Sequence, residues 1–174
     1  MQYNVAQLMK SEVGDLRQDH LHEEINNLDN SITPLSPLDG DIKLVRTNEG
    51  IFVEADLHTS LQLECSRCLD LFGKAVRIRI DEEFLPTIDI LSGSRLALDE
   101  EADPANLIDV RHELNVAELV RQSLLLTLPV APLCRSNCKG LCPVCGKNRN
   151  REKCHHESDE IDPRLARLKE LLDK

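Results

Sequence analysis

Apolar and polar residues alternate along the central part of the chain. In the segment 51–63 nearly every second residue is apolar, and shorter alternating runs cover 42–46 and 76–80. Successive side chains of a β-strand point to opposite faces of the sheet, so this pattern predicts three strands with one buried face. Asn48 and Gly50 indicate a turn between the first two strands. The segment is therefore expected to form an antiparallel β-meander, with the register of its third strand left open.

A helical spacing of apolar residues follows later in the chain. Asn115 can cap a helix that ends at about Leu128, just before Pro129, and a second, short amphipathic helix is expected over 162–172. The apolar stripe of the first helix predicts that it packs on the sheet, which makes the fold class α+β. Three further segments are expected to form a short helix (4–9), a possible strand (16–25) and a loop (27–37).

Length and composition predict a globular protein. The length of 174 residues predicts one domain, or one domain with a small appended module, and the 41% hydrophobic and 30% charged residues are close to the averages of globular proteins. No apolar run approaches the roughly 20 residues that cross a bilayer, and the first ten residues lack the order of a signal peptide. We therefore expect a cytoplasmic location and no membrane contact.

The charge balance restricts the nucleic-acid-binding classes. The chain has 21 basic and 31 acidic residues, a net charge of −10, and only 2% aromatic residues. This excludes a protein that coats nucleic acid without specificity and one that stacks bases on a platform of rings, so any nucleic-acid contact must be local. The segment 81–113 holds ten acidic and two basic residues. It is expected to be mostly a solvated loop, with a docking surface for a basic partner as the alternative.

Seven cysteines are the unusual feature of the composition. An odd number of cysteines in a chain without an export signal fits metal ligands better than disulfides. Cys142 and Cys145 form a C-x-x-C pair that can hold Zn²⁺, and Cys154 and His156 complete a set of four candidate ligands. His155 is the competing imidazole.

A second set of four candidate ligands is divided between two distant segments. Cys65 and Cys68 lie between two predicted strands, whereas Cys134 and Cys138 follow the predicted helix. Each pair supplies only two ligands, so we expect the pairs to meet in one Cys₄ zinc site. A redox-active dithiol or two inert thiols are the alternatives for the first pair, but a reactive C-x-x-C normally lies at a helix N-terminus. The sequence therefore predicts two structural zinc ions.

Motifs for catalysis are incomplete. His112 and Glu113 begin the zinc-protease motif H-E-x-x-H, but Val116 stands where the second histidine is needed. His20 and His22 alternate on a possible strand without a third ligand nearby in the sequence, and they are expected to be surface residues. No glycine-rich phosphate-binding loop is present in the sequence. We therefore expect a protein that is not an enzyme.

Basic residues concentrate around the second cysteine set. Between positions 134 and 153 there are six basic residues and one acidic residue. Such a patch can contact phosphate groups, or it can be a solubilising face that balances the charge of the thiolates. Lys147, Arg149 and Arg151 lie between two candidate ligands, where a closed metal site would hold their loop in place. The candidate RNA-binding residues are Arg135, Lys139, Lys147, Arg149 and Arg151.

Three segments carry a resemblance to a known family. They are Glu64–Leu69 (E-C-S-R-C-L), the end of the helix at Leu124–Pro129, and the specific string Cys138–Asn148 (C-K-G-L-C-P-V-C-G-K-N). In these segments the chain resembles the YceD-like family, the large ribosomal RNA subunit accumulation proteins of bacteria and plastids. The resemblance implies a role in producing or accumulating large-subunit ribosomal RNA through ribosome assembly, with no established enzymatic activity.

The resemblance also bears on the two cysteine sets. The family often ends its last motif with C-x-C, whereas this chain has His156 in the final position, which can still bind zinc. Some members lack the Cys142 and Cys145 pair. This implies that the site at Cys65 and Cys68 is the older structural element.

Together these features predict two parts of the chain. Residues 1–133 would form an α+β body with the antiparallel β-meander, the packed helix and an acidic excursion at 81–113; residues 134–174 would form a Cys-rich zinc-binding segment and a short terminal helix. The leading hypothesis is a non-catalytic factor that binds large-subunit rRNA or a pre-ribosomal particle, with a basic ribosomal protein as a further partner. The alternatives are a zinc-stabilised protein–protein interaction module without RNA contact, and a thiol redox enzyme or zinc hydrolase.

Overall fold

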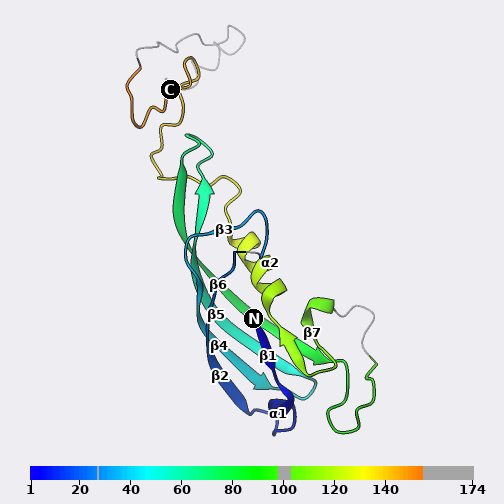
Figure 1. The fold of residues 1–174 in the computed structure, drawn as a ribbon. Coiled ribbons are helices and arrows are strands. Elements are labelled where there is room, and N and C mark those ends of the chain that lie inside the picture. The colour runs from blue at the N-terminus through cyan, green and yellow to red at the C-terminus, as the bar shows by residue number, and fades with distance from the viewer. Residues whose placement is uncertain (27, 98–102, 155–174) are drawn as a thin grey trace, which may run out of the picture.

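One elongated, twisted β-sheet forms the frame of the molecule (Figure 1). The computed structural model describes residues 1–26, 28–97 and 103–154. The strand order is β2-β4-β5-β6-β7, and β3 also pairs with β5. Paired strands are antiparallel except for β6 and β7, which are parallel. The six strands are β2 (Leu16–Glu23), β3 (Thr33–Pro34), β4 (Leu38–Arg46), β5 (Ile51–Glu64), β6 (Leu71–Pro86) and β7 (Leu107–Ile108).

The predicted meander is confirmed by β4, β5 and β6. The turn between β4 and β5 is closed by Gly50, whose N–H donates to the Thr47 hydroxyl oxygen at 2.8 Å. β5 and β6 pair over the whole length of β5, from Ile51 opposite Phe84 to Glu64 opposite Leu71. This pairing supplies the register that the sequence pattern left open.

The end of the β5–β6 hairpin extends beyond the rest of the sheet. β4 pairs with β5 only as far as His58, and β3 only as far as Gln62. The hairpin tip therefore projects from the body, and the chain that follows α2 (Ala117–Thr127) reaches it (Figure 1). Cys65 and Cys68 lie at this tip.

The main core lies between one face of the sheet and α2. The face toward α2 is apolar because strand residues of one parity are almost all hydrophobic, as the alternation predicted. The opposite face carries charged side chains such as Asp41 and Arg77. The largest fully buried side chains are Phe84, Leu38, Ile42, Leu44, Ile51, Leu57, Leu61, Ile108, Leu114, Leu124, Val5 and Val53.

Helix α2 ends before Pro129, as expected, but its N-cap residue is Val116 rather than Asn115 and makes no side-chain cap hydrogen bond. Asn115 lies one residue earlier, and its Oδ1 atom accepts from the N–H of Ala117 at 3.0 Å. A small two-stranded sheet of β1 (Gln2–Asn4) and β8 (Glu113–Asn115) leads into the helix. Strand β1 was not predicted from the sequence. The helix expected at 4–9 includes the observed α1 (Ala6–Met9).

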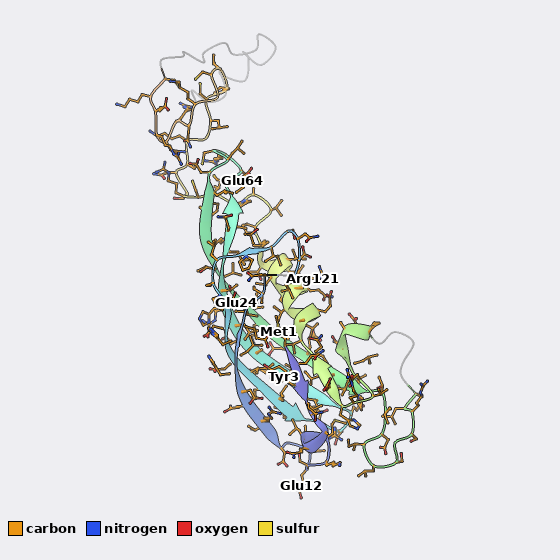
Figure 2. The ribbon with its side chains drawn as sticks, viewed as in Figure 1. Met1, Tyr3, Glu12, Glu24, Glu64 and Arg121 are labelled. Carbon is orange, nitrogen blue, oxygen red and sulfur yellow. The ribbon has the colours of Figure 1, made fainter. Side chains whose placement is uncertain are left out.

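Arg121 joins α2 to the loop after β2 (Figure 2). Its guanidinium lies 3.1 Å from Asp29 Oδ2 and 2.6 Å from Glu118 Oε1. The hydrogen bonds that Glu118 accepts from Arg121 and from the Gln122 amide lower its pKa to about 2. The loop over part of the core is thereby held by a charged contact with the helix.

Part of the acidic segment 81–113 forms regular secondary structure. The acidic segment 81–113 was expected to be mostly loop, but residues 81–86 continue β6, and Pro104–Asn106 form a 3₁₀ helix before β7. Two of its carboxylates accept hydrogen bonds there: Asp81 accepts one from Arg79 at 2.7 Å, and Glu83 accepts one from Thr47 at 2.6 Å. These bonds help the strand to continue through the acidic residues.

The helix expected over 162–172 lies outside the described residues. Among the residues described, no helix is long and apolar enough to cross a membrane.

Two leucines of α2 offer a matched test of the core. Leu124 is fully buried, whereas Leu126 is 86% exposed. We expect Leu124→Ala to lower the free energy of unfolding by about 2–5 kcal/mol, since it leaves a cavity in the core. Leu126→Ala should change it by less than about 0.5 kcal/mol. Denaturant unfolding measures both, and equal losses would contradict the described orientation of α2.

Candidate metal centre

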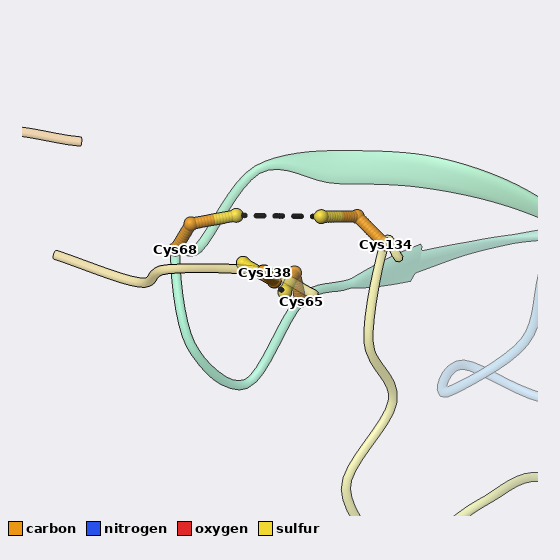
Figure 3. Close-up of side chains that lie close together, drawn as sticks. All are labelled: Cys65, Cys68, Cys134 and Cys138. Atoms are coloured by element: carbon orange, nitrogen blue, oxygen red, sulfur yellow. Dashed lines mark hydrogen bonds between the residues drawn. The ribbon is translucent and has the colours of Figure 1, made fainter. Parts of the chain in front are cut away.

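A cluster of four thiols joins two segments that are distant in the sequence. Cys65 and Cys68 come from the tip of the β5–β6 hairpin, and Cys134 and Cys138 come from the chain after α2 (Figure 3). The four Sγ atoms all lie within 4.8 Å of one another. We call this set the four-thiol cluster. It contains the residues expected to form one Cys₄ site.

The sulfur–sulfur distances fit a tetrahedral metal ion. The Sγ atoms of Cys65 and Cys138 lie 3.8 Å apart, and those of Cys68 and Cys134 lie 3.7 Å apart. A tetrahedral ion with metal–sulfur bonds of about 2.3 Å separates its ligands by about 3.8 Å, whereas a disulfide requires about 2.05 Å. The four cysteines are free thiols at the spacing of metal ligands.

The surroundings of these sulfurs favour the thiolate form at two of the four cysteines and disfavour it at the other two. The pKa of Cys65 is lowered to about 6, chiefly by the N–H of Cys134, against the opposing effect of burial. At Cys68 the N–H of Asp70 lowers the pKa, but burial and the neighbouring thiols raise it to about 12. Burial raises the pKa of Cys134, whereas at Cys138 the effect of burial is outweighed by hydrogen bonds from the Gly140 N–H and the Asn150 amide, which lower its pKa. Four negative charges side by side are thus disfavoured. A bound cation would remove this penalty, because metal binding requires the thiolate form.

The hairpin tip is held in shape by backbone hydrogen bonds. Leu69 N–H donates to the Cys65 carbonyl at 2.9 Å, and Cys65 N–H donates to the Asp70 carbonyl at 3.0 Å. Leu69 adopts a positive φ of 60°, which reverses the chain within this turn. The segment after α2 is attached here, since Ser66 N–H donates to the Pro132 carbonyl at 2.8 Å. Both cysteine pairs are therefore positioned by main-chain contacts as well as by sulfur.

A second set, the three-thiol cluster, consists of Cys142, Cys145 and Cys154. Its Sγ atoms also lie within 4.8 Å of one another. The N–H groups of Cys145 and Val144 lower the pKa of Cys142 to about 7. Gly146 closes the turn with a φ of 70° and donates its N–H to the Cys142 carbonyl at 2.9 Å. This set can supply three thiolates to a metal ion.

The expected fourth ligand of the three-thiol cluster is outside the described residues. His156, and the competing His155, belong to the segment 155–174, which the structure does not describe. Either imidazole as the fourth ligand stays a prediction.

The two clusters are linked by side-chain contacts that the sequence did not predict. Asp70 accepts a hydrogen bond from Asn148 Nδ2 at 2.8 Å and forms an ion pair with Arg151 Nη2 at 3.1 Å. Asn150 donates through Nδ2 to Cys138 Sγ at 3.3 Å. Asn148 is part of the string that carries the family resemblance, but its partner is 78 positions away. Only the folded structure could reveal this pairing.

The candidate RNA-binding residues fall into two groups. Lys147 Nζ lies 3.0 Å from Glu152 Oε2, and Arg151 is bound to Asp70. Within the described part of the chain, Arg135, Lys139 and Arg149 form no ion pair. A shallow hollow of about 230 Å³ is lined by Lys139, Arg149, Glu152, Lys153 and Cys154. The unpaired cations, rather than Lys147 and Arg151, are thus the ones available to a phosphate group.

A family model named for the large ribosomal RNA subunit accumulation protein YceD matches residues 53–172. The chain belongs to the YceD family. This match begins in β5 and includes every cysteine of both clusters. The resemblance seen in the sequence is therefore confirmed.

Relatives from a bacterium and a plant are similar over most of this chain. An uncharacterized protein of Mycobacterium tuberculosis is 30% identical over 135 residues, which cover 78% of this chain and 62% of the relative. A chloroplastic protein of Arabidopsis thaliana, named large ribosomal RNA subunit accumulation protein YCED homolog 1, is 21% identical over 159 residues, covering 80% and 50%. The chain spans about half to three fifths of the length of these relatives. No solved structure gives a significant match.

Replacing one cysteine in each cluster should separate their structural roles. The four-thiol cluster closes a span of 66 positions between Cys68 and Cys134, whereas Cys145 and Cys154 are nine positions apart. A link that closes a longer loop restricts the unfolded chain more. In metal-loaded protein, Cys68→Ser should therefore lower the unfolding midpoint by roughly 5 °C or more beyond Cys145→Ser. Thermal unfolding measures the difference, and equal losses would argue against this role.

Proposed function

We propose that this protein is a non-catalytic factor in the accumulation of large-subunit ribosomal RNA, that it acts during ribosome assembly, and that structural zinc stabilises the end that contacts RNA. The observation that carries the proposal is membership of a family named for large ribosomal RNA subunit accumulation. The relative from Arabidopsis has the same role in its name. The partners we propose are large-subunit rRNA, alone or within a pre-ribosomal particle, and a basic ribosomal protein.

The donor set supports zinc as the metal. Four thiolates in tetrahedral arrangement select zinc or an iron–sulfur cluster among common metals, and a mononuclear ion fits sulfurs 3.7–3.8 Å apart. Zinc has no redox chemistry of its own, so it serves as a cross-link between the hairpin tip and the segment after α2. Its binding free energy would then add to the stability of the fold.

The arrangement of the four-thiol cluster supports a non-catalytic role. A catalytic zinc keeps one coordination position open for water or substrate, whereas the four-thiol cluster would fill all four positions with sulfur. Three of its four cysteines are also buried. A thiol redox role is disfavoured because bound zinc would occupy the thiolates that such chemistry needs.

The basic side chains around the three-thiol cluster support RNA contact at this end. Lys139, Arg149 and Lys153 line one hollow and project beside a site that would hold their loop in place. Phosphate contacts of this kind are insensitive to base sequence. RNA would thus meet the cysteine-rich end rather than the acidic body.

One observation favours the alternative of a protein–protein interaction module. Three apolar side chains on the cysteine-bearing segments are exposed, namely Leu69 (56%), Leu71 (62%) and Val144 (63%). Exposed apolar side chains can contact a protein partner. The RNA-binding experiment below separates the two functions.

We expect two zinc ions for each chain. The eight candidate ligands form two sets, of which seven sulfurs are already grouped as four and three. Metal analysis of purified protein should therefore give two zinc per chain, and Cys65→Ser with Cys68→Ser should reduce the number to one. The matched pair Cys142→Ser with Cys145→Ser should also leave one. A single zinc in the parent protein, with Cys65 and Cys68 open to alkylation in the native state, would remove the four-thiol site.

Removing the three cations that line the hollow beside the three-thiol cluster should weaken RNA binding. We expect the triple variant Lys139→Ala, Arg149→Ala, Lys153→Ala to bind a large-subunit rRNA fragment more weakly than the parent. Each lost phosphate contact should flatten the dependence of log K on log salt by about 0.7–0.9, so three contacts change the slope by roughly 2 to 3. Fluorescence anisotropy at several salt concentrations measures both effects.

The control removes the same charge from the body. Lys10→Ala, Arg17→Ala, Lys43→Ala lowers the net charge equally but leaves the cysteine-rich end unchanged, so its RNA binding should stay close to that of the parent. Zinc content and unfolding midpoint must match the parent in both variants. If the variant with Lys139, Arg149 and Lys153 replaced binds RNA as tightly as the parent at every salt concentration, the result would contradict RNA contact at this end and favour the protein–protein interaction module.

A further inference from the structure

Two strand edges face each other across a gap between the two sheets. β1 belongs to the two-stranded sheet, and β2 is an outer strand of the larger sheet (Figure 1). The Met1 nitrogen lies 3.0 Å from Glu23 Oε1, and Arg17 Nη1 donates to the Asn4 carbonyl at 3.3 Å. The two strands therefore run beside each other in opposite directions, although among the described residues no backbone hydrogen bond joins them.

The hydrogen bonds of each strand show which backbone groups face the gap. In β1 the odd-numbered residues bond β8, since Val5 N–H donates to the His112 carbonyl at 2.9 Å. In β2 the odd-numbered residues bond β4, since Arg46 N–H donates to the Asp15 carbonyl at 2.8 Å. Successive residues of a strand direct their N–H and C=O groups to opposite sides, so the even-numbered residues direct theirs into the gap. These residues include Gln2 and Asn4 of β1 and Gln18, His20 and His22 of β2.

The gap has room for one extended chain. Almost every Cα–Cα distance between β1 and β2 exceeds 8 Å. Neighbouring strands of a sheet lie about 4.7–4.9 Å apart, so two strands that flank a third lie roughly twice as far from each other. A hollow of about 400 Å³ is lined by all of β1 and most of β2.

We propose that the gap between β1 and β2 binds an extended basic segment of a partner protein, which forms a strand between them. The main chain of this segment would bond both edges and join the two sheets in the order β8-β1-segment-β2-β4. Addition of a strand to a free sheet edge is a recurring mode of peptide recognition. The proposal gives a binding place to the basic ribosomal protein named above and rests on that partner, but not on RNA contact at the cysteine-rich end.

The side chains around the gap favour a segment in which apolar and polar residues alternate. On the core side, Leu21 is buried and Tyr3 is half-buried. On the open side, His20 and His22 are exposed, and both imidazoles lie against the Asp39 carboxylate. Side chains of a strand point alternately to the two faces, so every second residue of the segment would pack toward the core.

The charge of the protein favours a basic segment. The chain has a net charge of −10, which attracts a cationic peptide and repels a second copy of this chain. Asp19, Glu23 and Arg17 line the hollow. Burial and then the charges of Asp19 and Glu23 raise the pKa of the Tyr3 phenol, against the opposing effect of Arg17. The negative charge of β2 therefore acts across the gap on β1.

The test uses the whole chain with its cysteine clusters loaded with zinc. The probe is a fluorescent peptide as long as β2 in which lysine and valine alternate. Fluorescence anisotropy should show saturable binding, whereas a peptide with glutamate in place of lysine should not bind. The lysine–valine peptide with every second backbone nitrogen methylated keeps its charge but loses the hydrogen-bond donors of one edge. It should bind at least about tenfold more weakly.

Amide signals in NMR spectra locate the bound peptide. Those of Gln18, His20 and His22 should shift and exchange more slowly with solvent, because their N–H groups gain acceptors. The N–H groups of Asp19 and Leu21 already face β4, so their exchange should change little.

One position of β2 separates the main chain from the side chain. His20→Pro removes an N–H that faces the gap and leaves the bonds to β4 in place, and proline is tolerated at such positions of edge strands. It should weaken binding of the lysine–valine peptide by about tenfold or more. The control His20→Val removes the imidazole but keeps the N–H, so it should bind as the parent does.

The proposal would be overturned by the absence of saturable binding, by equal binding of the methylated or the glutamate peptide, or by amide shifts that lie outside β1 and β2. Zinc content and the unfolding midpoint are measured in both variants. If His20→Pro does not fold, the methylated peptide and the amide shifts of the parent decide the question. Binding of the rRNA fragment by the parent is measured in parallel. RNA binding without peptide binding would refute the strand addition alone, and peptide binding without RNA binding would refute only the RNA contact.

Discussion

The pairing of β5 with β6 over all fourteen residues of β5 is the interaction on which the rest of the structure depends. It gives the sheet its length, it provides one side of the core that α2 covers, and it continues beyond the last residue that β4 can support. A two-stranded ribbon without further strands is only marginally stable in water. The exposed end of this hairpin therefore needs another source of stability, and the chain supplies one by returning after α2 to place two cysteines against the tip.

The contacts at the hairpin tip depend on one another. The four-thiol cluster joins the returning chain to the hairpin. Asp70 of the hairpin then connects the segment of the three-thiol cluster to the tip, because it binds both Asn148 and Arg151. Gly140 allows this close approach, because a Cβ there would lie 3.0 Å from the Arg67 carbonyl oxygen and its φ is 70°. The second cluster thus takes its position from the first. This order agrees with the implication of the family patterns that the Cys65 and Cys68 site is the older element.

Sequence reasoning succeeded where the environment repeats along the chain and failed where it does not. The alternation in β5 could be recognised because one face is buried along most of its length, whereas β2 has a single buried residue, Leu21, and so shows no pattern. In β6 only residues 76–80 were predicted as strand. The residues before Val76 belong to the projecting hairpin and are mostly exposed, so they show no alternation of apolar and polar side chains. Cysteine spacing predicted the members of both thiol clusters. The Asp70 contacts depend on long-range folding, which no local pattern encodes.

The projection of the hairpin also bears on how an acidic protein could bind the RNA partner that we propose. Residues 134–153 carry six of the 21 basic residues and one of the 31 acidic ones, so the remaining chain has 15 basic against 30 acidic residues. The tip lies six residues beyond His58, the last residue of β5 that pairs with β4, which corresponds to roughly 20 Å of strand. Electrostatic interactions are screened over about 8–10 Å at physiological salt. A phosphate group at the tip would therefore experience mainly the local basic side chains, while the body would repel RNA that approached elsewhere. Distance, rather than net charge, is what would permit one end of this molecule to bind a polyanion.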